Sequence, residues 1–234
     1  MKRNALTRIG ASLAAFFLTT GFMIISFTFF AYSKEFYRYQ NNLNDTLATL
    51  KMSASQMEAF LEHFIQYFQN KSDTLQYTYL GTNGEYIVFF KANELLHMAD
   101  VRHLFNIMLG LSTVMLLSGI AIMVVLIIRK RFAAIGFGLK VGNTIYLGFM
   151  IIIGIAALIN FDDAFMIFHQ ILFPSGNFIF PFNSNMIKFL PESFFMWAAL
   201  IIICCGLIFS LVSLVSGIII SKKEKRRINQ KNAS

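Results

Sequence analysis

The segment Leu104–Ile128, LFNIMLGLSTVMLLSGIAIMVVLII, decides the fold because none of its 25 residues carries a charge. A helix needs about 20 predominantly apolar residues to cross the hydrocarbon core of a membrane. Three further apolar segments of comparable length lie at residues 9–32, 141–159 and 194–220. Because a chain in lipid must satisfy its own backbone hydrogen bonds, we expect four transmembrane helices.

The distribution of basic residues predicts how these spans are oriented. The predicted inner segments, residues 1–8, 129–140 and 221–234, hold 13 of the 20 Lys and Arg residues and one acid, Glu224. An excess of Lys and Arg on short loops marks the cytoplasmic side. Both termini are therefore predicted to be cytoplasmic. The net charge of +8 reflects topology and anionic headgroups, and no nucleic-acid partner is expected.

This reasoning divides the chain into successive segments. They are residues 1–32 (cytoplasmic N-terminus and first span), 33–103 (extracytoplasmic domain), 104–128 (second span), 129–140 (cytoplasmic loop), 141–159 (third span), 160–193 (extracytoplasmic or interfacial loop), 194–220 (fourth span) and 221–234 (mobile cytoplasmic tail). The first apolar run exceeds the length typical of a signal peptide, so we expect it to remain as an uncleaved span.

The outer segment 33–103 is too long to be a simple connection and is expected to fold. Helical spacing of apolar residues between 34 and 70 predicts two amphipathic helices. The second is expected at the membrane interface, packed on the spans, or in a small soluble core. The β-rich runs Thr74–Leu80 and Glu85–Phe90 flank Asn83-Gly84, which predicts a hairpin near residues 74–90. The predicted fold is an all-α membrane protein with four transmembrane helices and an extracytoplasmic α-helical plus β-hairpin domain.

The third span offers no packing signal in the glycines that we compared. Gly142, Gly148 and Gly154 lie six residues apart. Helices that approach closely use glycines four residues apart, so these three support no prediction about which helix the third span contacts.

All four histidines fall on the predicted outer side, and two of them lie where helices meet the membrane surface. His97 is in a helix predicted to begin at a cap on Asn93, and His169 is in a helix predicted to begin at Asp162 or Asp163. Imidazole is the side chain that titrates nearest neutrality. Neighbouring carboxylates and an arginine complete a set suited to acid–base acyl transfer. They are Glu94, Asp100, Arg102, Asp162 and Asp163.

Simpler roles stay open for several of these residues. His63 and His103 are expected to be structural, and a structural role for His97 alone is as well supported as a catalytic one. Asp162 and Asp163 are most simply helix caps. The chain has no G-x-S-x-G nucleophile and no H-E-x-x-H run, so we expect neither a nucleophilic serine nor a metal, and no cofactor.

Two segments of the chain resemble motifs of the lipoprotein intramolecular transacylase (Lit) family of Gram-positive bacteria. The first is ELLHMADVR at Glu94–Arg102. The second is FMIFHQILFPSGNF at Phe165–Phe178, which continues to LPESFF at Leu190–Phe195. The layout of four spans and an outer domain is also similar to that family, so the resemblance covers nearly the whole chain.

The resemblance implies an activity on bacterial lipoproteins. The implied substrate carries a diacylglyceryl group on its N-terminal cysteine, and its sn-2 acyl chain moves to the α-amino group of that cysteine, giving the lyso form. His97 and His169 match the family's two key histidines, while Asp100 and Arg102 match neighbouring motif positions. The implied partners are the lipoprotein N-terminus and membrane lipid, with the enzyme in the cell membrane and its site at the outer leaflet. The sequence leaves the oligomeric state open, and we expect a monomer.

The residues suit this reaction. The attacking α-amine has a pKa of about 7.7–8.0, so a base that titrates near neutrality matches it. We interpret His97 as the base and His169 as the donor to the oxyanion or leaving oxygen, with the reverse assignment nearly as well supported. The alternatives are a membrane lipid hydrolase, which could depend on a metal, and a non-enzymatic sensor or transporter. A transporter would need ionisable groups near mid-membrane, which the spans essentially lack.

Overall fold

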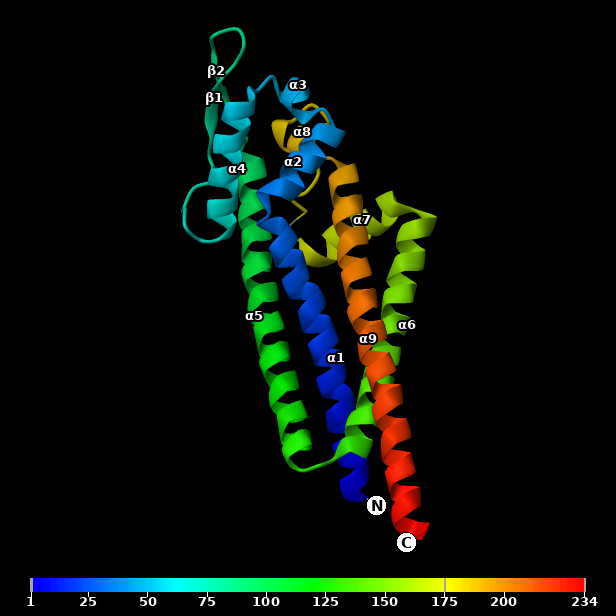
Figure 1. The fold of residues 1–234 in the computed structure, drawn as a ribbon. Coiled ribbons are helices and arrows are strands. Elements are labelled where there is room, and N and C mark those ends of the chain that lie inside the picture. The colour runs from blue at the N-terminus through cyan, green and yellow to red at the C-terminus, as the bar shows by residue number, and fades with distance from the viewer. Residues whose placement is uncertain (1, 175, 234) are drawn as a thin grey trace. The chain divides into compact units, whose positions relative to one another are not determined.

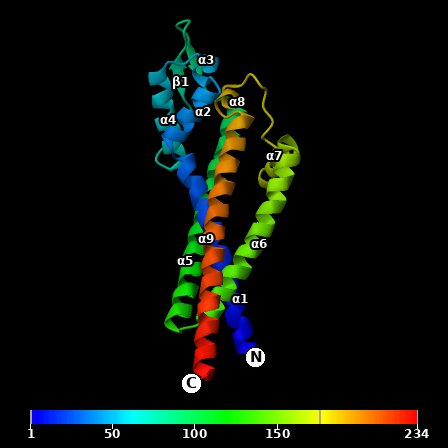
Figure 2. The same ribbon diagram turned by 45° about the vertical axis from the view of Figure 1, so that its right-hand side comes forward.

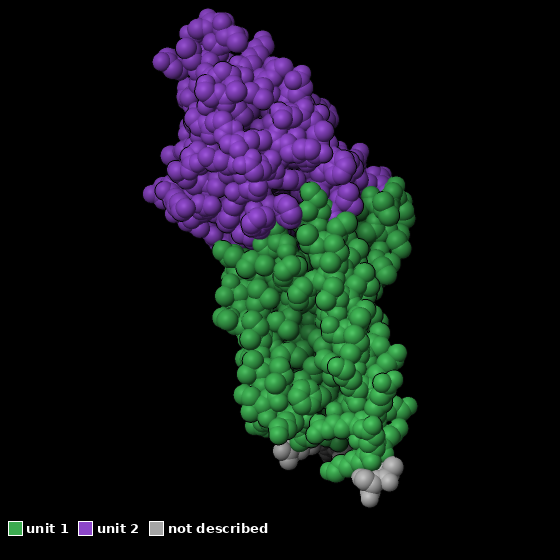
Figure 3. Space-filling model, in the orientation of Figure 1, with its two compact units in different colours: residues 1–26, 108–159, 201–234 green, residues 27–107, 160–200 purple. Residues whose placement is uncertain are grey.

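The computed structural model describes residues 2–174 and 176–233, and the chain is mostly helical (Figures 1 and 2). It divides into two compact units, which Figure 3 distinguishes by colour. Unit 1 consists of residues 1–26, 108–159 and 201–234, and unit 2 of residues 27–107 and 160–200. Each unit is therefore assembled from segments that are far apart in the sequence.

Unit 1 is built from parts of four long helices, α1 (Lys2–Ala31), α5 (Ala92–Ile128), α6 (Phe132–Ile159) and α9 (Glu192–Ala233). All four are long and apolar enough to cross a membrane, which confirms the prediction of four spans. All four helices extend beyond the predicted spans. α1 begins at Lys2, α6 begins at Phe132, and α9 continues to Ala233 through the basic segment predicted to be a mobile tail. α5 begins at Ala92, one residue before the cap predicted at Asn93, and runs unbroken into the predicted span. The side of the membrane that each end faces stays a prediction.

Helices α1 and α6 approach each other through small residues. Ala11 of α1 is fully buried. A Cβ atom added at Gly138 would lie 2.4 Å from the backbone carbon of Ala11, and one added at Gly142 would lie 2.4 Å from the carbonyl oxygen of Ser12. Neither position has room for a side chain. Such close backbone contact is how helices gain van der Waals energy in lipid, where burial from water contributes nothing.

This contact corrects the sequence interpretation of the third span. Gly138 and Gly142 are four residues apart and form a G-x-x-x-G face that the comparison of Gly142, Gly148 and Gly154 did not include. The comparison of Gly142 with Gly148 and Gly154 failed because a Cβ atom at either of the latter two would meet nothing within 4 Å. The spacing from Gly142 to Gly148 and Gly154 is therefore irrelevant to packing, and the spacing from Gly142 back to Gly138 is the one that matters.

A buried hydrogen-bond network joins three helices inside unit 1. The hydroxyl of Thr19 on α1 donates to Oδ1 of Asn143 on α6 at 2.7 Å. The amide nitrogen of Asn143 donates to the carbonyl oxygen of Leu139 at 2.7 Å and to Ser213 Oγ on α9 at 2.8 Å. Thr19 and Asn143 are both fully buried. Every hydrogen-bonding group of the asparagine side chain is thus engaged without introducing a charge.

Unit 2 combines short helices with a two-stranded sheet. Its elements are α2 (Lys34–Leu43), α3 (Thr46–Leu50), α4 (Ala54–Phe68), β1 (Thr78–Leu80), β2 (Tyr86–Val88), α7 (Phe161–Leu172) and α8 (Asn185–Phe189), together with the adjoining ends of three long helices. Helix α4 begins with a capping box in which Ser53 and Gln56 satisfy each other's backbone N–H groups.

The core of unit 2 is aromatic and centres on Phe60 of α4, which is fully buried. Its ring stacks on Phe89 with centroids 4.0 Å apart and meets Phe189 edge-on at 4.9 Å. Phe64 follows one turn later, 5.1 Å from Phe189. The second predicted amphipathic helix thus contributes its aromatic face to a packed core, as in one of the placements left open.

The predicted hairpin is present, although its strands are shorter than the runs that suggested it. β1 and β2 are antiparallel, with Thr78 opposite Val88 and Leu80 opposite Tyr86. Gly84 has a φ of +82°, in the left-handed region that Asn-Gly turns supply at low cost. The second strand ends at Val88, because the next two residues, Phe89 and Phe90, are buried in the core.

Candidate functional site

His97 occupies the second turn of α5 and is buried, with 6% of its surface exposed. The helix begins at Ala92, so Lys91 stands at the cap position that we predicted for Asn93. Glu94 Oε2 accepts the backbone N–H of Lys91 at 2.8 Å, which fixes the start of the helix. The His97 Nδ1 atom is sealed from solvent and has no hydrogen-bond partner among the described residues.

His169 lies in the last turn of α7. Asn160, not Asp162 or Asp163, caps this helix, because the Asn160 side chain accepts the backbone N–H of Asp163. The Nδ1 atom of His169 lies 2.8 Å from the carbonyl oxygen of Phe165. A carbonyl can only accept, so Nδ1 carries the hydrogen and Nε2 of the neutral ring keeps a free lone pair.

The two histidines face each other although 72 positions separate their numbers in the sequence. Their ring centroids lie 6.1 Å apart with an interplanar angle of 27°. No hydrogen bond joins the two rings in the part of the chain that the structure describes, so each imidazole can act on a bound molecule independently of the other. The structure therefore brings together the two residues that the sequence singled out.

Phenylalanines surround the pair on several sides. Phe173 contacts both rings, at 4.9 Å from His97 and 5.6 Å from His169. Phe165 packs edge-on against His169 at 4.2 Å, Phe178 lies 5.4 Å from the same ring, and Phe180 lies 5.4 Å from His97. Contacts of this kind hold the imidazoles in place and keep water away from them.

Burial decides the charge state of His169. Desolvation lowers its pKa below the ordinary value of 6.5, and the hydrogen bond to Phe165 opposes this shift only in part. The ring is therefore neutral near pH 7, with the tautomer set by that hydrogen bond. A neutral imidazole with a free Nε2 is able to accept a proton.

The remaining predicted residues of α5 have contacts that do not include a hydrogen bond to either histidine in the described ranges. Glu94 is buried and holds the helix start, and Asp100 is exposed on the same helix, without a hydrogen bond or ion pair in the described ranges. The guanidinium of Arg102 lies 4.1 Å from the Tyr67 ring centroid and donates to the carbonyl of Ser72. Arg102 thus contacts the outer segment rather than either histidine.

The two aspartates of α7 serve the ends of helices. Asp163 accepts a hydrogen bond from the Asn160 side chain at 2.7 Å. Asp162 shares a hydrogen bond with Glu192 at the start of α9. Both aspartates are exposed, and no hydrogen bond joins either one to His97 or His169 within residues 2–174 and 176–233.

The other two histidines lie outside this arrangement. His103 is exposed, and the His63 ring packs 5.7 Å from that of Tyr77. The sequence analysis did not identify the phenylalanines that contact the two histidines. Phe165 and Phe173 stand four residues before and after His169, and this helical spacing was the available signal. Among the described residues, no group of three or more His, Cys, Asp or Glu is arranged to hold a metal.

Comparison with known proteins gives the arrangement a context. Residues 12–195 match the model of the family described as lipoprotein intramolecular transacylase Lit. The chain belongs to this family. It is a membrane-integral enzyme, and the resemblance seen in its two histidine segments is confirmed. The Lit match spans both segments and includes parts of both units.

Solved structures of the membrane-integral Lit from Bacillus cereus have the same fold. One matches with a TM-score of 0.71 at 19% identity and covers 98% of this chain and 99% of that chain. Variants of the same protein match as well. The one with a histidine-to-arginine mutation has a TM-score of 0.71 at 18% identity, with 96% of each chain covered. The one with a histidine-to-alanine mutation has a TM-score of 0.67 at 18% identity and covers 99% and 98%. No curated protein sequence matches the chain.

Proposed function

We propose that this Lit-family enzyme moves the sn-2 acyl chain of a diacylglyceryl lipoprotein to the α-amino group of its N-terminal cysteine, using His97 and His169 as acid–base groups. The observation that carries the proposal is the facing pair of imidazoles, 6.1 Å apart within a phenylalanine-lined site. The reaction needs no second substrate, because acyl donor and acceptor belong to one molecule. Positioning the two ends is then the main task of the enzyme.

The hydrogen bond on His169 supports a division of labour opposite to the one first favoured from the sequence. Its Nδ1–H is engaged by the Phe165 carbonyl, so the neutral ring presents a lone pair at Nε2 and no N–H. We assign the base to His169. His97, whose Nδ1 is sealed, would use Nε2–H to stabilise the oxyanion.

The proposed acyl transfer exchanges an ester bond for an amide bond within one molecule. The α-amine nitrogen attacks the sn-2 ester carbonyl while Nε2 of His169 removes the amine proton. A new C–N bond forms, and the bond from the carbonyl carbon to the glyceryl oxygen breaks. The proton on His169 then passes to the departing glyceryl oxygen, which leaves an N-acyl cysteine and a monoacylglyceryl group.

The aromatic lining supports transfer over hydrolysis. Water that reached the acyl carbonyl would compete with the amine and release a fatty acid. Phe165, Phe173, Phe178 and Phe180 occupy the surroundings of the two imidazoles and leave little polar surface for water to bind. The predicted topology would put this site at the outer leaflet, where mature lipoproteins carry their acyl chains.

Mass spectrometry of the N-terminal lipopeptide, from cells with and without the enzyme, tests the proposal. We expect conversion of the diacylglyceryl form to the N-acyl monoacylglyceryl form with no change in acyl count. His97→Ala and His169→Ala should each lower conversion by about 10²–10⁴-fold, whereas His103→Ala should not. A net loss of one acyl chain would instead identify a hydrolase.

Glutamine variants separate the two roles. A glutamine amide can donate an N–H but cannot take up a proton. His97→Gln should therefore retain more activity than His97→Ala, while His169→Gln should be as inactive as His169→Ala. If His169→Gln were the partly active variant, the sequence-based order of base and donor would be restored.

A further inference from the structure

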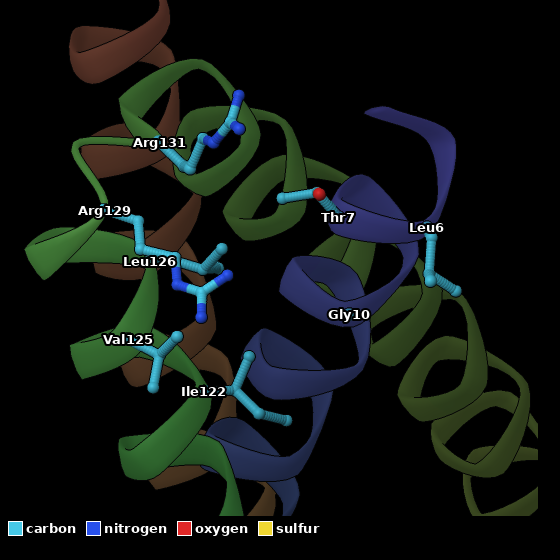
Figure 4. Close-up of a pocket in the computed structure, with 8 residues that line it drawn as sticks. All are labelled: Leu6, Thr7, Gly10, Ile122, Val125, Leu126, Arg129 and Arg131. Atoms are coloured by element: carbon cyan, nitrogen blue, oxygen red, sulfur yellow. The ribbon is translucent and has the colours of Figure 1, made fainter. Parts of the chain in front are cut away.

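A groove in unit 1 has features that acyl transfer does not use. It lies between α1 and the end of α5 and encloses a cavity of about 220 Å³ (Figure 4). Its apolar wall is formed by Leu6, Ile122 and Val125, and its other wall carries the guanidinium groups of Arg129 and Arg131. In Figures 1 and 2 the connection from α5 to α6 lies at the same end of unit 1 as both chain termini.

The groove exists because α1 has a glycine at this level. A Cβ atom added at Gly10 would meet nothing within 4 Å, in contrast to Gly138 and Gly142 on α6, where a Cβ atom would collide with α1. The space beside Gly10 is therefore not used for packing helices together. Glycine in the middle of a helix costs about 0.5–1 kcal/mol relative to alanine, so an unfilled position here has a cost without a packing benefit.

The two arginines of the groove have no partner within the part of the chain that the structure describes. Neither guanidinium group makes a salt bridge or a hydrogen bond there, and the hydrogen bonds of both residues are made by their backbones. Other arginines of unit 1 are engaged, since Arg8 lies 5.0 Å from the Phe137 ring and Arg227 faces Glu224. Glu224 is the one acidic residue in the sequence of unit 1, and it faces Arg227, so unit 1 supplies no carboxylate side chain to the groove.

The connection between α5 and α6 holds these two arginines in a fixed turn. Lys130 has a left-handed φ of 52°, and the backbone N–H of Arg131 donates to the carbonyl of Leu126 at 2.8 Å. This closes α5 as a Schellman motif. Arg131 in turn accepts from the first N–H groups inside α6, so its side chain sits at the positive end of that helix dipole.

We propose that this groove binds the headgroup of an anionic phospholipid, with the phosphate between Arg129 and Arg131 and the first part of an acyl chain along the wall beside Gly10. Guanidinium groups bind phosphate oxygens in a bidentate manner, and basic pockets between transmembrane helices suit such headgroups. If the two arginines served only as positive charges at the end of a transmembrane helix, no cavity beside them would be needed. A free phosphate ion would leave the apolar wall uncovered, whereas a lipid covers both walls.

Native mass spectrometry of the full-length protein released from micelles, titrated with phosphatidylglycerol or phosphatidylcholine, tests the site. The wild type should retain phosphatidylglycerol preferentially. The Arg129→Gln/Arg131→Gln double variant should bind it at least about tenfold more weakly, because each basic residue contributes on the order of 1 kcal/mol. Gly10→Leu should weaken binding similarly without changing the charge, because the leucine fills the groove.

The matched control is Lys222→Gln/Lys223→Gln, which removes the same charge from exposed positions of α9. It should change affinity by less than about twofold. Equal losses in the control and the arginine variant, with Gly10→Leu silent, would mean diffuse surface attraction and would overturn the proposal. Displacement of the lipid by inorganic phosphate at equal concentration would also overturn it, in favour of a phosphate site. Conversion of lipoprotein is a separate readout that these variants need not alter.

Discussion

The two units use opposite kinds of side chain for their interiors. In unit 1 the contact between α1 and α6 is made of alanine and glycine, with backbones close enough that no Cβ atom fits at Gly138 or Gly142. In unit 2 the centre is a cluster of phenylalanines around Phe60. Unit 1 packs backbone against backbone, whereas unit 2 packs ring against ring.

The difference follows from the solvent that each region meets. Helices in lipid gain nothing by hiding apolar side chains, so close approach and hydrogen bonds hold them together. A domain in water gains about 25 cal/mol for each Å² of apolar surface that it buries, and aromatic rings bury the most. The aromatic core of unit 2 is therefore what the predicted extracytoplasmic position requires.

Buried polar groups differ between the units in their chemistry. In unit 1 the side chain of Asn143 is fully hydrogen-bonded, and the buried atoms without a partner among the described residues are the hydroxyls of Thr20 and Ser210. In unit 2 the unpartnered atoms include Nδ1 of His97, which lies beside His169. A hydroxyl stays neutral near pH 7, whereas an imidazole can take up or release a proton.

The largest stability effect should come from the aromatic core. Phe60→Ala removes a fully buried ring that contacts several others, so it should lower the free energy of unfolding by about 3–5 kcal/mol. Thermal unfolding in detergent, followed by near-ultraviolet circular dichroism, measures the change.

Phe182→Ala is the matched control for this substitution, because Phe182 is 95% exposed. It should change the unfolding free energy by less than about 0.5 kcal/mol in detergent. A loss below about 1 kcal/mol for Phe60→Ala would show that the rings fill space without stabilising unit 2, and the contrast between the units would fail.

The close contact of α1 and α6 gives the next effect. Gly142→Ala places a Cβ atom 2.4 Å from a backbone oxygen of α1, so the helices must separate at a cost of about 1–3 kcal/mol. Gly148→Ala on the same helix should cost nothing, because its Cβ atom meets no other atom within 4 Å. Equal unfolding midpoints for the two variants would contradict the packing described for unit 1.

These glycines also mark the limit of what the sequence could predict. Long uncharged runs such as Leu104–Ile128 fix the four spans, and the Asn83-Gly84 turn fixes the hairpin, because both signals are local. The partner of Gly138 lies on another helix, and nothing near Gly138 in the sequence identifies it. His97 and His169 were found by their chemistry, but the hydrogen bond that sets the tautomer of His169 depends on the backbone of α7.

The polar network of unit 1 should have a smaller effect. Asn143→Ala removes three hydrogen bonds and leaves the Thr19 hydroxyl without its acceptor. Hydrogen bonds between membrane helices average about 0.6 kcal/mol, so the loss should be about 1–2 kcal/mol. Ser216→Ala is the control, because the half-buried Ser216 donates to the carbonyl of Val212 on its own helix and not to another helix. An Asn143→Ala variant as stable as Ser216→Ala would mean that the network does not hold the helices.

The smallest effect concerns pH and should arise in unit 2. Burial lowers the pKa of His169 below its unfolded value near 6.5, so the unfolded chain binds more protons as the pH falls below that value. The contribution of His169 to the free energy of unfolding should therefore be fully present above pH 6.5 and should decrease as the pH falls below 6.5.

His169→Phe keeps an aromatic ring but cannot titrate, so its unfolding midpoint should vary less between pH 7 and pH 5 than that of the wild type. His103→Phe, at an exposed position, should leave the wild-type pH dependence in place. Identical curves for wild type and His169→Phe would mean that folding does not shift the pKa of His169, and the desolvation described for this ring would be wrong.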